Sequence, residues 1–271
     1  MVTSKLHRGS DGRRVGLARA LSKLGYCSRS RAAELIRAGR VKLNGVERRD
    51  PEAPVQVGHD RLEVDGKTAA AERKIYLMMN KPRGVVTTAS DEKGRATVYA
   101  KLGEQLPWLA PVGRLDKASE GLLLLTNDSE WAARIAAPET HLDKTYHVQI
   151  NAVADGALLE KLKKSVRSEN GELLRVKHAE VLRHGEKNTW VVIVLDEGKN
   201  RQIRRIFEAL GIEVLRLVRV AIGPVVLGDL RKGDYRPLTA EEKRALDESM
   251  KRLSAAQISR LPRESHPDTL S

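Results

Sequence analysis

The sequence predicts an α+β protein of 271 residues, with a small basic module ahead of a larger domain. Between Ile75 and Pro237, segments with strand and helix patterns follow one another without the regular alternation that a doubly wound parallel sheet requires. Residues 1–49 hold thirteen Lys or Arg and three acidic residues, which is +10 of the chain's net charge of +13. Basic charge that is concentrated in this way indicates a polyanionic partner.

Two short helices are expected at the start of the basic module. Residues 17–24 place leucines on one helical face, and Gly25 ends that helix. Ser28 or Ser30 can cap a second helix, which ends at Gly39. Both segments are therefore helices of only a few turns.

A small sheet completes this module, which we expect at residues 15–67 after a disordered basic arm at residues 1–14. Asn44-Gly45 stands between two short β-type segments, a pattern typical of a hairpin. Residues 61–65 alternate apolar and polar side chains, which predicts a further strand. The basic side chains of the second helix and the turn after it are Arg29, Arg31, Arg37, Arg40 and Lys42.

Composition excludes several classes of protein. Cys27 is the single cysteine, so no intramolecular disulfide forms, and we expect a core position in a reducing compartment. His141 and His147 do not have the spacing of helical ligand pairs, so no metal site is expected. No run approaches the roughly 20 apolar residues of a membrane helix, and the basic N-terminus lacks the apolar segment of a secretory signal. The sequence therefore predicts a cytoplasmic protein without membrane contact.

The larger domain is expected at residues 75–250, after a linker at 68–74 and before a frayed tail at 251–271. It begins with a strand, a turn at residues 80–84 and another strand with β-branched residues. Thr239-Ala-Glu-Glu242 has the pattern of a capping box and opens the last helix.

One loop in this domain places a carboxylate between two cations. Asp116 stands between Arg114 and Lys117, and the strongly apolar run Leu122–Leu125 follows almost at once. A rigid strand can therefore hold this loop at the edge of a cleft. Such a carboxylate can act as a nucleophile or a base beside an anionic substrate.

A later helix carries an unusual group of arginines. Its apolar side chains between Ile203 and Leu210 share one face, Asn200 can cap its start, and Gly211 ends it. The helix dipole disfavours cations at the N-terminal end, so a group of them there indicates a compensating anion. The arginines in question are Arg201, Arg204 and Arg205.

These segments resemble known families over residues 15–240. LARALSKLGYCSRSRAAELIRAGRVKLNGVE is similar to the S4-type RNA-binding domain. GRLD with GLLLLTND, then KTY, then EGKNRQIRRIFEALG and LRLVRVAIGPVVLGDL resemble the pseudouridine synthases that modify ribosomal RNA. The resemblance implies an S4-like α-L domain followed by a catalytic domain with a central mixed, largely antiparallel sheet.

The resemblance also implies a reaction and its residues. Uridine becomes pseudouridine without cofactor or metal, and Asp116 is the catalytic carboxylate. Tyr146 stacks on the base, and Arg204 orients Asp116 and offsets the cost of burying it. Without the neighbouring motifs, an ordinary half-buried strand position is the better interpretation of Tyr146, and Arg204 can pair with Glu208. The expected RNA contacts are Arg29, Arg31, Arg37, Arg40, Lys42, Lys81, Arg114, Arg201 and Arg205, of which Arg114 can fill the space that the base vacates and Lys81 can instead be structural.

The expected partner is ribosomal RNA or a pre-ribosomal particle, and the third motif and short linker favour the large subunit. We expect a monomer, because no apolar stripe is left over for a partner. Two other functions stay open: a non-catalytic rRNA-binding assembly factor with the same fold, and an aspartate-dependent hydrolase of a small anionic molecule. The basic module argues against the hydrolase, since a small substrate needs no RNA-docking surface.

Overall fold

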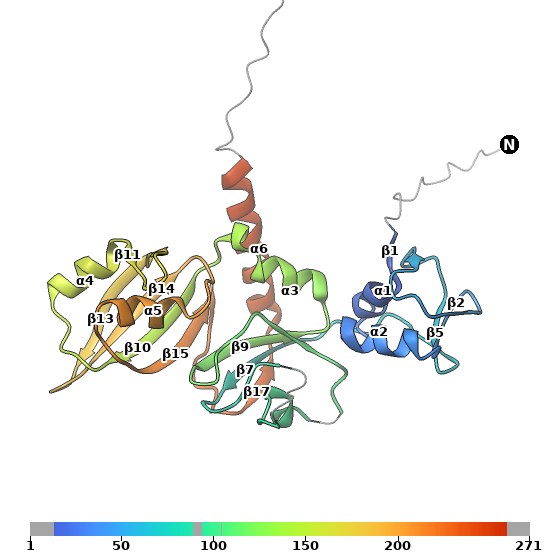
Figure 1. Cartoon of the computed structure of the whole chain (residues 1–271), viewed down its shortest axis with the longest axis horizontal. Helices are drawn as coiled ribbons and strands as arrows, with labels where there is room; N and C mark the ends of the chain where they lie inside the picture. The colour runs from blue at the N-terminus through green and yellow to red at the C-terminus, as the bar shows by residue number, and fades with distance from the viewer. Residues whose placement is uncertain (1–13, 89–93, 104, 259–271) are drawn as a thin grey trace, which may run out of the picture. The chain divides into compact units, whose positions relative to one another are not determined.

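The computed structural model describes residues 14–88, 94–103 and 105–258 of the chain (Figure 1). The chain forms two compact units. The first holds the residues up to Ile75 together with 103–110 and 126–130, and the second holds the rest. The predicted basic arm, except for its last residue, and the end of the predicted tail lie outside the described residues.

The helices of the N-terminal unit are as predicted. α1 spans Leu17–Lys23, and α2 spans Arg29–Arg37. Ser28 caps α2, because its side chain accepts a hydrogen bond from the backbone N–H of Arg31 at 3.1 Å. The Cys27 thiol is buried among these helices as expected, and burial raises its pKa to about 11.

Short strands pack beside the two helices. Asn44 and Gly45 both have positive φ, 51° and 80°, which is the backbone that a tight two-residue hairpin needs. The pairing order is β3-β2-β5-β6, with β1 and β4 as a separate pair. β6 runs into the segment predicted as the linker, and Ala69 after it is buried. The strands are β1 (Val15–Gly16), β2 (Val41–Leu43), β3 (Val46–Arg48), β4 (Pro54–Val55), β5 (Leu62–Val64) and β6 (Lys67–Thr68).

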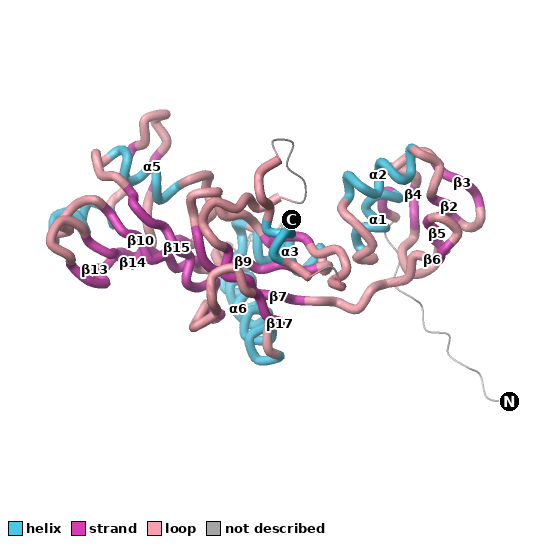
Figure 2. The backbone as a smooth tube through the Cα atoms, turned by 90° about the horizontal axis from the view of Figure 1, so that it is seen from below, coloured by secondary structure: helices cyan, strands magenta, loops and turns pink. Residues whose placement is uncertain are grey.

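The second unit is built on a mixed sheet with the order β13-β14-β10-β15-β9-β7-β17 (Figure 2). β15 pairs with β9 in parallel, whereas β10 is antiparallel to both β14 and β15. β17 pairs antiparallel with β7, the first strand of the unit. The predicted mixed, largely antiparallel sheet is confirmed. Its strands are β7 (Tyr76–Lys81), β8 (Ala110–Val112), β9 (Glu120–Thr126), β10 (Lys144–Ile150), β13 (His178–His184), β14 (Thr189–Leu195), β15 (Val214–Ile222), β16 (Val225–Val226) and β17 (Tyr235–Pro237).

Helices pack against this sheet over two hydrophobic cores, and Figure 1 shows the helices involved. One packs α4 and α5 on β10, β13 and β14, with Phe207 and Leu162 buried in it. The other packs α3 and α6 on β7 and β9, with Trp131 and Leu246 buried. The remaining elements are α3 (Ser129–Ala136), α4 (Gly156–Lys163), α5 (Gln202–Ala209), α6 (Ala240–Ile258), the 3-10 helices η1 (Val98–Lys101) and η2 (Pro138–Thr140), and the strand pair β11 (Val166–Arg167) and β12 (Leu173–Leu174).

The capping box of the last helix is present with both of its bonds. The Thr239 N–H donates to the Glu242 carboxylate at 2.8 Å, and the Glu242 N–H donates to the Thr239 hydroxyl at 3.1 Å. The α6 helix that follows extends to Ile258, past the predicted start of the tail at residue 251. No helix of the described residues is both long and apolar enough to cross a membrane.

Two local expectations differ from the structure. The strand predicted after the turn at 80–84 is only an isolated bridge between Val86 and Thr97. The α5 helix begins at Gln202, one residue later than predicted, because Arg201 rather than Asn200 is the N-cap, with a left-handed φ of 49°.

Candidate active site

A buried lysine holds the loop that carries Asp116 by hydrogen bonds to its backbone. Lys81, the last residue of β7, has no solvent exposure, and its ammonium donates to three backbone carbonyls. These are Asp116 at 3.1 Å, Ser119 at 2.8 Å and Pro82 at 3.1 Å. The expected RNA contact of Lys81 is therefore wrong in this structure, and its structural alternative holds, because all three donors point into the protein.

Burial also changes the charge balance of Lys81. Desolvation lowers its pKa to about 8, against the opposing effect of the nearby carboxylates of Asp116 and Glu120. With a pKa of about 8 the ammonium is mostly charged at neutral pH, and it donates to three carbonyl oxygens of buried or part-buried backbone.

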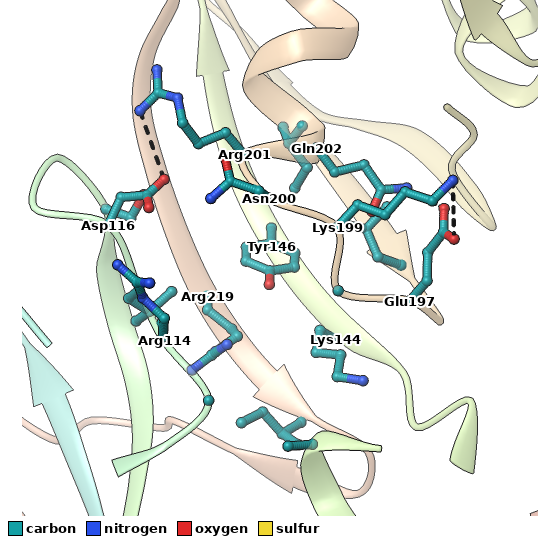
Figure 3. A pocket seen from close by; sticks show the side chains of 18 of the residues that line it. Arg114, Asp116, Lys144, Tyr146, Glu197, Lys199, Asn200, Arg201, Gln202 and Arg219 are labelled. Atoms are coloured by element: carbon teal, nitrogen blue, oxygen red, sulfur yellow. Dashed lines mark hydrogen bonds and ion pairs between the residues drawn. The ribbon is translucent and has the colours of Figure 1, made fainter. Parts of the chain in front are cut away.

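Asp116 pairs with a different arginine from the one that the sequence suggested. An Nη1 atom of Arg201 lies 3.8 Å from an Asp116 carboxylate oxygen (Figure 3). The two side chains are 50% and 30% exposed, so this ion pair is half-solvated. Arg201 is the N-cap of α5, so the start of this helix supplies the cation beside Asp116.

Arg204 acts instead on the backbone of the same loop. Its guanidinium donates to the carbonyl of Ala118 at 3.1 Å and to that of Val214 at 3.2 Å. Burial, followed by the neighbouring charge of Arg201, lowers the pKa of Arg204. Arg204 thus forms a bridge between the Asp116 loop and β15, and its predicted role, to orient Asp116, stays a prediction.

A pocket of about 380 Å³ opens beside Asp116, within the size range of ligand sites. It is lined by the Asp116 loop, by β10 and β15, and by the segment that leads into α5. Tyr146 projects into its centre from β10 (Figure 3). Arg114 lines the pocket from the loop and is exposed.

The floor of the pocket carries two cations that sequence reasoning missed. Lys144 lies two residues before Tyr146 on β10, and Arg219 on β15 is the cross-strand partner of Tyr146. The register shifts between Thr145 and Tyr146, a β-bulge that allows both Arg219 and Ile222 of β15 to line the pocket. An arginine within the apolar run LVRVAI was the available signal for Arg219.

Close packing of β9 against β15 sets the position of Arg219 in the pocket. Gly121 of β9 pairs with Arg219 in the parallel register, and its φ is +103°. A Cβ atom on Gly121 would lie 2.2 Å from the Arg219 carbonyl oxygen, so only glycine allows this approach.

The remaining predicted contacts lie in different settings. Arg205 bonds Glu172 at 2.7 Å and does not line the pocket. In the N-terminal unit, Arg31 pairs with Glu34 at 2.9 Å, and Arg40 pairs with Asp65 at 2.6 Å. Three basic side chains have no side-chain partner among the described residues: Arg29, Arg37 and Lys42.

Within the described ranges, no cluster of three His, Cys, Asp or Glu residues has metal-binding geometry.

The pocket combines a carboxylate beside arginines, an aromatic ring, and two cations, Lys144 and Arg219, on its floor. Together with the basic α-helical module, this combination defines an enzyme that acts on an anionic substrate bearing a flat group.

Comparison with known proteins identifies the class more closely. The RNA pseudouridylate synthase family matches residues 75–209, and the S4 domain matches residues 15–69. Ribosomal large subunit pseudouridine synthase B of Bacillus subtilis (strain 168) is 38% identical over 232 residues, which is 85% of this chain and 94% of that protein. An uncharacterized RNA pseudouridine synthase of Aquifex aeolicus (strain VF5) is 37% identical over 229 residues, 84% and 92% of the two chains.

A solved structure agrees with this assignment. The crystal structure of a pseudouridylate synthase aligns with a TM-score of 0.61 at 31% identity, covering 86% of this chain and 99% of that one. The chain belongs to the RNA pseudouridine synthase family, which isomerises uridine in RNA to pseudouridine. The resemblance seen in the sequence is confirmed.

Proposed function

We propose that this enzyme converts a specific uridine of large-subunit ribosomal RNA to pseudouridine, with Asp116 as its catalytic carboxylate. The observation that carries the proposal is the position of Asp116, beside Arg201 at the pocket that Tyr146 enters. The name of the Bacillus subtilis relative supports large-subunit rRNA as the substrate. Cys27 is a free thiol and the single cysteine, which supports a cytoplasmic location.

The isomerisation of uridine requires few catalytic groups. The bond from ribose to the base nitrogen breaks, and a bond from ribose to carbon 5 of the base replaces it, so nothing is oxidised and nothing is lost. A carboxylate can attack the ribose or the ring, or take a ribose proton. Asp116 is the less constrained of the two pocket carboxylates: it has one loose ion pair with Arg201 at 3.8 Å, whereas Glu197 pairs with Lys199 at 3.5 Å and also accepts a hydrogen bond from Gln202.

The aromatic ring and the exposed cations can each bind a different part of the RNA. The target base leaves its stack at a cost of a few kcal/mol, and Tyr146 supplies a flat surface that holds it in the pocket. Arg114 and Arg201 are exposed beside Asp116 and serve the flanking phosphates. Arg29, Arg37 and Lys42 of the N-terminal unit add attraction to the RNA backbone.

The direct test replaces one oxygen of the carboxylate. Asp116→Asn abolishes pseudouridine formation in rRNA and keeps RNA affinity within about threefold, since the change removes a reacting group and no phosphate contact. Asp229→Asn, at an exposed position outside the pocket, is the matched control. Pseudouridine mapping of rRNA from cells with each variant measures the effect. Retained modification with Asp116→Asn refutes the assignment, and unmodified rRNA with the wild type favours a non-catalytic assembly factor.

A further inference from the structure

The two cations on the pocket floor lack counter-charges. Arg219 is 5% exposed, and its Nε donates to the carbonyl of Leu122 at 2.7 Å. Its Nη2 is buried without a hydrogen-bond partner. Lys144 is half-buried, and within the described parts of the chain its ammonium has neither a hydrogen bond nor an ion pair. A buried donor without an acceptor is costly and calls for an explanation.

The surroundings of Lys144 disfavour its positive charge. Desolvation lowers the pKa of Lys144, and the charge of Arg219 lowers it further. The carboxylates that oppose this effect already have other partners. Asp143 lies 2.7 Å from Lys177, and Asp196 lies near His141 and Arg175 at 3.7 and 4.0 Å. Two like charges are therefore held together in a partly dry site with no anion of the described protein between them.

We propose that Lys144 and Arg219 bind the carbonyl oxygens of the target uracil and stabilise the negative charge that the base carries while it is detached from the ribose. This inference rests on the proposed function. It deepens that function by assigning the groups that hold the leaving base. A uracil on Tyr146 brings its edge to the immediate neighbours of that ring, which are Lys144 on the same strand and Arg219 across it (Figure 3).

The positions of Lys144 and Arg219 favour the uracil base, rather than a phosphate, as their ligand. A flipped nucleotide keeps its phosphates with the RNA backbone, outside the pocket. The exposed cations of the lining are Arg114, Lys199 and Arg201. Lys199 already pairs with Glu172 and Glu197, whereas Arg114 and Arg201 can meet those phosphates in solvent. Lys144 and Arg219 lie deeper, where hydrogen bonds to a developing charge are worth most.

The charge arises in a balanced sequence of steps. When the bond between the ribose C1′ and the base N1 breaks, its electron pair stays on the base and spreads to the two carbonyl oxygens. Meanwhile Asp116 either bonds to C1′ or takes the C2′ proton. The base then bonds to C1′ through C5 as the Asp116 ester breaks or the C2′ proton returns. Loss of the C5 proton and protonation of N1 complete the isomerisation. In these two routes, attack on the ribose and removal of a ribose proton, the base is anionic between the two bonds.

The first experiment separates chemistry from binding. An rRNA fragment that carries tritium at C5 of the target uridine is mixed with excess enzyme, and tritium release is followed. Lys144→Met lowers the single-turnover rate constant about 100-fold, the size expected for one donor to a developing oxyanion, and keeps the RNA Kd within about threefold. Lys161→Met, an exposed residue of α4 outside the pocket, leaves both unchanged.

A conservative variant distinguishes charge from packing. Lys144→Arg keeps the cation and restores most of the rate lost in Lys144→Met. In the wild type the rate falls at alkaline pH as Lys144 loses its proton, in the field of Arg219 on β15, Asp143 beside it and Asp196 after β14. In Lys144→Arg this fall moves to higher pH, because arginine stays charged. A role in packing alone would leave the pH profile unmoved.

An atomic change in the RNA tests the contact itself. Replacing a carbonyl oxygen of the target uracil with sulfur, as in 4-thiouridine or 2-thiouridine, weakens that hydrogen-bond acceptor. The change at the oxygen that Lys144 contacts slows the wild type and has little effect on Lys144→Met, because that contact is already gone, whereas the change at an oxygen that only Arg219 contacts slows both enzymes.

The outcomes are distinct. A wild-type single-turnover rate in Lys144→Met overturns the inference and leaves Asp116 untouched. A loss confined to Kd and its salt dependence overturns it in favour of a phosphate site. Absence of pseudouridine with the wild-type enzyme overturns the proposed function and this inference together.

Discussion

Several basic residues of the N-terminal unit and three cations around the Asp116 loop are the same residue types in opposite settings. In the N-terminal unit, Arg29, Arg37 and Lys42 are exposed, and Arg31 and Arg40, which have acidic partners, are about half exposed. In the pocket domain, Lys81, Arg204 and Arg219 are buried or half-buried and donate to backbone carbonyls. Exposed cations attract a polyanion over a distance that salt limits. Buried cations hold a loop in place, and salt screens them little.

The largest effect is expected where a buried cation holds the Asp116 loop. Arg204→Ala removes the donors to Ala118 and Val214, so the loop shifts and kcat falls about 100- to 1,000-fold, since an ångström of misplacement costs about 100-fold. RNA affinity stays within a few-fold. Single-turnover rates and filter binding measure the two quantities. An Arg204→Ala enzyme with a normal kcat would show that the bridge between the loop and β15 is dispensable.

A second buried cation should make stability depend on pH. The folded pKa of Lys81 is about 8, below its ordinary 10.5, so the unfolded chain binds more protons between these values and stability rises with pH there. The free energy of unfolding of the wild type, relative to Lys81→Met, should increase by about 3 kcal/mol from pH 8 to pH 10.5.

Denaturant unfolding at several pH values measures this difference. At neutral pH, Lys81→Met itself is less stable than the wild type by about 2 kcal/mol, because buried carbonyls lose their donor. Lys187→Met, at an exposed turn, is the control and shows no such trend. A pH-independent difference between wild type and Lys81→Met would contradict the buried-cation description.

A half-exposed cation at the same site should matter less. Arg201→Ala removes an ion pair of 3.8 Å that water already screens, so kcat falls about tenfold or less. The ratio of the Arg204→Ala loss to the Arg201→Ala loss is the informative quantity. If Arg201→Ala lowers kcat more than Arg204→Ala does, direct contact with the carboxylate contributes more than support of the loop. The exposed cation then matters more for catalysis than the buried one.

The smallest effects are expected in the N-terminal unit. Arg37→Ala and Lys42→Ala each weaken RNA binding by about three- to tenfold and reduce the slope of log Kd against log salt by about 0.7–0.9. Arg31→Ala, whose guanidinium already pairs with Glu34, changes the slope less. Titrations between 50 and 200 mM KCl measure the slope, and kcat at saturating RNA stays constant. Equal slopes for all variants would place the RNA elsewhere.

Local chemistry in the sequence predicted local structure well. The Ser28 cap, the turn at Asn44-Gly45 and the Thr239 capping box each depend on a few consecutive residues, and all three are present. Such features form through backbone hydrogen bonds that the neighbouring residues alone determine.

The arrangement of the site depends on contacts between distant residues, and there the sequence was insufficient. Arg201, the left-handed N-cap of α5, pairs with Asp116, whereas Arg204 donates to the backbone of the Asp116 loop. Lys144 and Arg219 meet only because a bulge shifts the register between β10 and β15. Neither the helix start nor the register can be read from the periodicity of one segment.

The pairing of β17 with β7 has a consequence for the order of folding during synthesis. Tyr235 pairs with Met79, so the sheet cannot close until nearly all of the catalytic chain has left the ribosome. Contacts so distant in sequence form late, because the loop between them must close first. The hydrophobic core of the S4 domain needs only residues between Val15 and Ala69. Each new molecule therefore completes its RNA-binding fold before the fold that modifies RNA.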